Sequence, residues 1–120
     1  MNTDSSNLLL LDRQLALARI GGDKELLGEL AQAFLEEYPV LLSSVREGLA
    51  EGEAKEAANA AHQLKGLLGQ FGAEPARLVA ARLEQTCKAG NLVEAESEFA
   101  ALQTSMQQLY PLLRALSEPD

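Results

Sequence analysis

The sequence predicts an all-α protein, specifically an up-down antiparallel four-helix bundle with a short additional N-terminal helix. Apolar residues recur at steps of three and four over most of the chain. No segment alternates with the two-residue period of a strand, and short connections containing Gly, Pro or Asn separate the periodic segments. Leu and Ala dominate while aromatic residues supply only 4%, so the core is expected to be aliphatic.

The first two predicted helices each begin after an aspartate. Asp12 can cap a short helix that ends at Gly21-Gly22, and Asp23 can cap a long helix that extends to about Gly52. Pro39 lies inside the long helix, where it removes one backbone hydrogen bond. Because the apolar stripe keeps its phase on both sides of Pro39, we expect a kink and not a break.

Three further helices complete the predicted bundle. The third covers about residues 53–73, and the fourth begins at Pro75 and ends at Gly90. Asn91 and Glu94 have the spacing of a capping box, which opens the last helix. Short connections between long helices favour antiparallel neighbours, which is the basis of the up-down prediction.

Length and charge limit the possible functions. A chain of 120 residues fits one domain, here residues 8–120, behind a polar tail of residues 1–7 that we expect to be disordered. The net charge of −8 argues against nucleic acid and membrane surfaces as partners. With Cys87 as its one cysteine and with no apolar run long enough for insertion, we expect a cytoplasmic monomer that binds other proteins.

The only histidine, His62, is predicted to point into solvent. At about 100° per residue, the apolar residues of its helix fall within roughly 60° of the opposite direction. They are Ala57, Ala60, Leu64, Leu67, Leu68 and Phe71. A lone histidine in a bundle is more often a structural residue, but an exposed position leaves that role without a partner.

The predicted outer face around His62 is small, polar and locally basic. Its members lie within about 80° of His62: Lys55, Ala58, Asn59, Lys65, Gly66, Gly69 and Gln70. No Asp or Glu occurs between Glu56 and Glu74, so no carboxylate of the same helix would repel an anion at His62. Each interior glycine costs about 1 kcal/mol of helix propensity, which suggests that Gly66 and Gly69 clear space for a docking protein.

This face has the chemistry for phosphoryl transfer. An exposed imidazole is largely neutral at pH 7 and can act as a nucleophile toward phosphorus. Lys65, one turn on, can neutralise phosphoryl oxygens, and Gln70 can form a hydrogen bond with them. Without the histidine beside them, Lys65 and Gln70 would be ordinary solvated residues.

The segment AHQLKGLLGQFGA, residues 61–73, resembles the signature of histidine-containing phosphotransfer (HPt) domains. The short Asp-led helix, the FLEEYP segment and the Leu83-Glu84 pair extend the resemblance over about residues 8–116. The resemblance implies that His62 is phosphorylated, that Lys65 and Gln70 steady the phosphoryl group, and that Gly66 permits docking. Lys55, Ala58, Asn59 and Gly69 would then belong to the docking surface, with Leu64 and Gly72 as structural residues of the motif.

The resemblance also implies the partners. They would be response-regulator receiver domains, which supply the aspartyl phosphate and its Mg²⁺, and a hybrid sensor histidine kinase. No ATP-binding glycine loop is found, so we expect a phosphocarrier without kinase activity, and no cofactor or metal of its own.

Three other functions compete with phosphotransfer. A helical module that docks a partner without phosphotransfer is the main alternative. A haem-binding bundle would need an inward-facing histidine, and no Cys-x-x-Cys-His motif is present. One His and one Cys on different helices are too few ligands for a zinc site.

Overall fold

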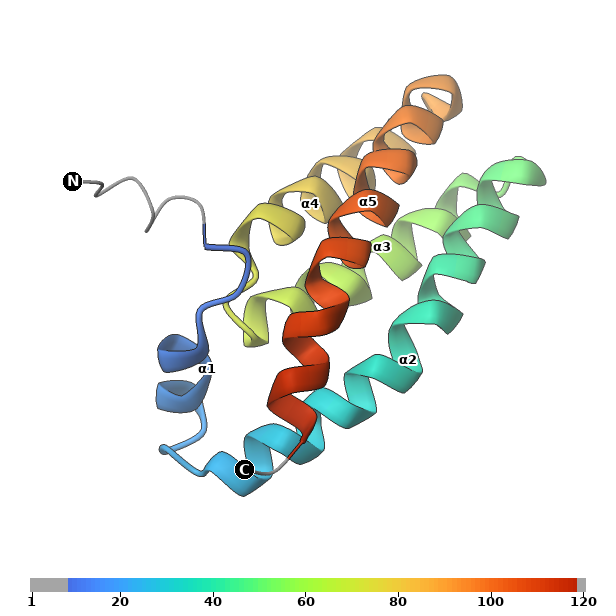
Figure 1. The fold of residues 1–120 in the computed structure, drawn as a ribbon. Helices are drawn as coiled ribbons and strands as arrows, with labels where there is room; N and C mark the ends of the chain where they lie inside the picture. Colours follow the sequence, from blue (N-terminus) through green and yellow to red (C-terminus); the bar gives the residue numbers. More distant parts are fainter. Residues whose placement is uncertain (1–8, 119–120) are drawn as a thin grey trace.

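The computed structural model describes residues 9–118. Within this range the chain forms helices and no strand (Figure 1). The helices are α1 (Arg13–Arg19), α2 (Lys24–Ala50), α3 (Ala54–Gln70), α4 (Glu74–Lys88) and α5 (Leu92–Ser117). The all-helical fold class is therefore confirmed, whereas the predicted tail of residues 1–7 lies outside the described range.

The predicted N-caps form. The side chains of Asp12 and Asp23 each accept a hydrogen bond, 3.0 Å long, from the backbone N–H three residues on. Asn91 caps α5 in the same way at 3.2 Å. Glu94 differs from a standard capping box, because it accepts a bond from the side chain of Asn91 and not from its backbone N–H. Local sequence signals therefore place the start of three helices.

Pro39 lies within α2 and does not break it. Its side chain is exposed, so the ring projects away from the core. Helix α2 continues through Pro39 to Ala50, which agrees with an apolar stripe that keeps its phase.

Helix α3 ends three residues earlier than predicted because of Gly72. This residue has φ +65°, a left-handed conformation that favours glycine. The N–H of Ala73 then bonds back to the carbonyl of Leu68 at 3.0 Å and closes the helix end. A Cβ on Gly72 would lie 2.7 Å from Cβ of Asp12, whose N–H donates to the Gly72 carbonyl. Gly72 thus joins the end of α3 to the start of α1.

The four long helices pack as a bundle. Helix α3 contacts α2 and α4, and helix α5 contacts the same two helices from the other side. Figure 1 shows the chain reversing direction at each short connection between them. The core is mainly Leu and Ala, with stacked Phe34 and Phe71 rings whose centroids are 5.4 Å apart. Helix α3 is therefore held on two sides and leaves one face open.

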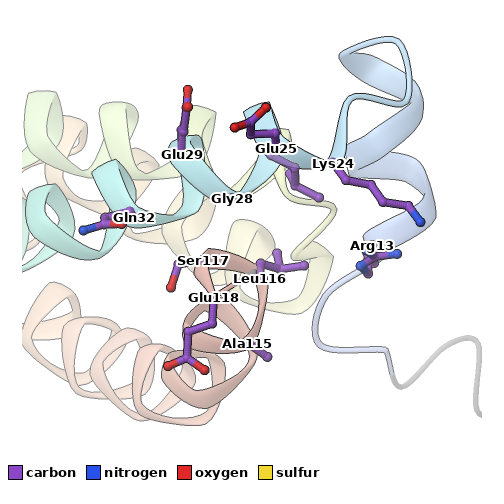
Figure 2. Close-up of a pocket in the computed structure, with 11 residues that line it drawn as sticks. Arg13, Lys24, Glu25, Gly28, Glu29, Gln32, Ala115, Leu116, Ser117 and Glu118 are labelled. Atoms are coloured by element: carbon purple, nitrogen blue, oxygen red, sulfur yellow. The ribbon is translucent and has the colours of Figure 1, made fainter. Parts of the chain in front are cut away.

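A glycine permits close approach of α2 and α5. A Cβ on Gly28 would lie 3.1 Å from the carbonyl oxygen of Leu116. Figure 2 shows this region, where the end of α5 lies beside the start of α2 and side chains of both charges line a pocket. None of the predicted site residues lines this pocket.

Candidate functional site

His62 projects from the open face of α3. Its side chain is 64% exposed, as the helical phase predicts. The apolar residues on the opposite side of the helix are buried, apart from Leu67, which is half-buried against the core. Core packing therefore fixes the rotation of α3 and turns His62 outward.

A buried carboxylate from α4 holds the imidazole. Nδ1 of His62 lies 3.0 Å from Oε2 of Glu84, whose side chain is only 3% exposed. Glu84 sits on the buried face of α4, one turn after Ala80 and just under one turn before Cys87. A buried charge needs partners, and His62 is one partner of Glu84. Glu84 is therefore a member of the site around His62 and not an ordinary core residue.

Two lysines complete the charge balance around Glu84. Nζ of Lys65 lies 2.8 Å from Oε1, and Nζ of Lys88 lies 3.0 Å from Oε2. Burial raises the pKa of the Glu84 carboxyl, but its contacts with Lys65, Lys88 and His62 outweigh this effect and lower the pKa to about 2. Glu84 is therefore ionised at neutral pH, and one carboxylate links three side chains.

Glu84 and Lys88 are members of this site that the sequence did not indicate. Helical phase locates only the carboxylates on the histidine's own helix, where none is near, and the neighbouring helix supplies one. A charged residue inside the apolar stripe of α4 is the signal that could have indicated it. Lys65 was expected to face a phosphoryl group, and in the structure it pairs with Glu84.

The prediction that Ala58 lies on the outer face is wrong. Ala58 is only 3% exposed and belongs to the core. Ala58 and Lys65 lie about 40° and 60° to one side of His62, and this is the side that α4 covers. His62 is therefore at the edge of the open face and not at its centre.

Gly69 lies toward the same covered side. A Cβ on Gly69 would be 3.4 Å from Cδ of Arg77 on α4, and its carbonyl accepts a hydrogen bond from Arg19 on α1. The prediction that Gly69 clears space for a docking protein is therefore wrong, because Gly69 faces α4 of its own bundle. Gly66 differs, because no atom lies within 4 Å of the position of its Cβ.

The remaining predicted residues divide by exposure. Lys55, Asn59 and Gln70 are exposed on α3, whereas Leu64 is fully buried. Gln70 is eight residues after His62, which is about 12 Å along the helix axis. Gln70 is therefore not adjacent to the imidazole of His62, as the expected contact with a group on His62 would require.

No helix in the described part of the chain is long and apolar enough to cross a membrane. Among residues 9–118, no three His, Cys, Asp or Glu side chains gather in an arrangement that could hold a metal ion. The site around His62 contains one imidazole, one buried carboxylate and two ammonium groups.

The fold and the site define a small helical bundle with an exposed imidazole and two lysines nearby, groups that can hold an anion. The family model of the Hpt domain matches residues 29–110, more than half of the chain. The chain belongs to the Hpt domain family, whose members act in histidine phosphotransfer in two-component systems. Neither curated proteins nor solved structures gave a significant match.

Proposed function

We propose that this protein is a phosphorelay carrier. It accepts a phosphoryl group on His62 from an aspartate of one receiver domain and donates it to an aspartate of a response-regulator receiver. The observation that carries the proposal is the contact of Nδ1 of His62 with Glu84 on an otherwise exposed imidazole. One nitrogen of the ring is oriented by the protein, and the other is left for the reaction.

The contact with a carboxylate indicates which nitrogen of the His62 ring carries the hydrogen. An ionised carboxylate only accepts hydrogen bonds, so Nδ1 must carry the hydrogen and donate it to Glu84. In the neutral imidazole, Nε2 then holds the lone pair and is the nucleophile. Glu84 also favours the positive charge that develops on the ring as Nε2 attacks.

The transfer step exchanges one bond for another. The lone pair of Nε2 forms a bond to phosphorus while the bond between phosphorus and the aspartyl oxygen breaks, and the receiver's carboxylate leaves with that electron pair. The proton stays on Nδ1, within reach of Glu84. The same steps in reverse load the second receiver, so the protein acts as a phosphocarrier without ATP-dependent kinase activity.

The open face of α3 is the proposed docking surface for receivers. Gly66 lets a partner approach the helix closely, and the exposed side chains of Lys55, Asn59 and Gln70 surround the approach. In-line transfer needs the two reacting atoms about 3 to 3.5 Å apart. A residue without a side chain one turn from His62 supports such an approach.

The other features of the proposal follow from the family and the charge. Members of the family interact with receiver and kinase components of phosphorelays, and we assign a hybrid sensor histidine kinase to the upstream side. Mg²⁺ belongs to the partner receiver. We also propose a cytoplasmic monomer with one domain, folded as an up-down antiparallel four-helix bundle, which the contacts between the long helices support.

The test is transfer from a receiver domain that carries labelled phosphate. We expect the label to move to the wild-type protein in an acid-labile, alkali-stable form and not to move to His62→Gln. Receiver affinity of His62→Gln should stay near that of the wild type. Label on Ser or Thr would refute the assignment, and binding without any transfer would favour the docking module.

A further inference from the structure

Glu84 carries a negative charge close to the ring on which the proposed reaction places a negatively charged phosphoryl group. Its side chain is buried, and Oε2 contacts Nδ1 of His62 directly. A phosphoryl group bound to the same ring brings about one and a half to two negative charges close to this carboxylate. Because the carboxylate and the phosphoryl group would repel each other, a Glu84 without positively charged partners would destabilise the phosphorylated state.

Lys65 and Lys88 have different positions relative to Glu84 and His62. Lys65 is on α3, one turn from His62 on the same side as α4, and contacts Oε1. This contact is an ion pair made by an ammonium at the end of a flexible four-carbon chain, and the side chain of Lys65 is 28% exposed. Lys65 can therefore turn toward another anion nearby.

Lys88 contacts the oxygen that His62 also contacts. Its Nζ and Nδ1 of His62 are both 3.0 Å from Oε2 of Glu84. Nζ of Lys88 therefore lies close to Nδ1 of His62, with one carboxylate oxygen between them. Lys88 is on α4, at i+4 from Glu84, so its contact does not depend on α3 or on the state of His62.

We propose that Lys88 is a positioning residue that keeps Glu84 neutralised, so that Lys65 can leave Glu84 and bind the phosphoryl group on His62. This inference rests on the proposed function. Before transfer, two ammonium groups share one carboxylate; after transfer, each ammonium has its own anion. Without Lys88, Lys65 would have to serve both anions.

The simpler explanation is an ordinary surface ion pair within one helix. Such pairs contribute little, because both partners are solvated and flexible. The pair of Lys88 and Glu84 differs, since the carboxylate is buried and is shared with the reacting ring. A surface pair would affect stability slightly and would not affect the chemistry of His62.

The test compares the lifetime of the phosphorylated histidine in Lys88→Gln, Glu84→Gln and the double variant. Phosphoramidate, a small-molecule phosphoryl donor, loads His62 without any receiver, so the result does not depend on the relay. Arg82→Gln is the matched control, because it removes one positive charge from an exposed position on the opposite side of α4. Lys88→Arg keeps the charge.

We expect Lys88→Gln to shorten the lifetime of the phosphohistidine several-fold, while Arg82→Gln and Lys88→Arg leave it near the wild-type value. In the Glu84→Gln background, Lys88→Gln should have no further effect, since no carboxylate remains to be neutralised. An unchanged lifetime in Lys88→Gln would overturn the proposal. So would an equal loss in both backgrounds, which would mean that Lys88 acts on the phosphoryl group or on stability directly.

The same variants separate this inference from the relay itself. With a phosphorylated receiver as donor, a wild-type protein that accepts no label refutes the proposed function, whatever the lifetimes after chemical loading. Lifetimes that do not depend on Lys88 in a protein that transfers normally refute only the role of Lys88.

Discussion

Nδ1 of His62 lies 3.0 Å from Oε2 of Glu84, although the two residues are on different helices and only the histidine is exposed. The contact orients the ring and selects which nitrogen faces a partner. It also places a negative charge near the phosphoryl group that His62 is proposed to carry.

Substitution of Glu84 should change the tautomer of His62. In Glu84→Ala no acceptor holds the Nδ1 hydrogen, so both neutral tautomers should be present and the transfer rate should fall. Glu84→Gln can still accept through its amide oxygen and should keep most of the Nδ1-protonated form. Nitrogen chemical shifts of the ring report the tautomer directly. Identical ring shifts in the wild type and Glu84→Ala would contradict the assigned role.

Acid should destabilise the wild type more than Glu84→Gln. The pKa of Glu84 is lowered to about 2 from the ordinary value of 4.5, so its contribution to stability is fully present above about pH 4.5 and is lost as the pH falls toward 2. Since one pKa unit corresponds to about 1.4 kcal/mol, the contribution is on the order of 3 to 4 kcal/mol.

Urea denaturation of both proteins between about pH 6 and pH 3 measures this difference. The other carboxyl groups titrate in both proteins and cancel in the comparison. The free energy of unfolding of the wild type should fall relative to that of Glu84→Gln as the pH decreases. Parallel curves would show that Glu84 is not held in its charged form by the fold.

Gly66→Ala should stabilise the protein, because a Cβ at this position meets no atom within 4 Å and alanine is favoured in helix interiors by about 0.5 to 1 kcal/mol. Gly66→Gln should fold but reduce receiver affinity and transfer rate. Melting curves and transfer assays measure the two effects. Gly48→Ala is the contrasting control, since its Cβ would lie 3.0 Å from the backbone N of Ala57 and should destabilise the protein. Normal transfer by Gly66→Gln would remove Gly66 from the docking surface.

Gly72→Ala should lower the free energy of unfolding by more than about 1 kcal/mol. The residue has a positive φ, and a Cβ would collide with Asp12. Because Asp12 begins α1, the strain should loosen α1 first, and limited proteolysis should cut near residues 13–22 sooner than in the wild type. Gly52→Ala, whose Cβ meets no atom within 4 Å at a similar φ, separates backbone strain from the collision. Equal effects of the two substitutions would show that contact with Asp12 adds nothing.

Local signals in the sequence were sufficient to place the start of three helices. Asp12, Asp23 and Asn91 cap helices because each side chain bonds a backbone group only three residues away. The stripe of Leu64 and Leu68 places His62 on the opposite side of the same helix, since side-chain direction within one helix depends only on the helical repeat. The exposure of the histidine was therefore predictable.

The composition of the site was decided by the tertiary structure. Glu84 reaches His62 because α3 and α4 pack at one particular rotation and register, which the interlocking of core side chains sets and no periodicity within one helix encodes. The same packing buries Ala58 and covers Gly69, so the open face is narrower than the phase of α3 alone indicates. The sequence by itself determined where α1, α2 and α5 begin and that His62 faces outward. Only the packing of α4 against α3 decided that His62 would share a buried carboxylate with Lys65 and Lys88.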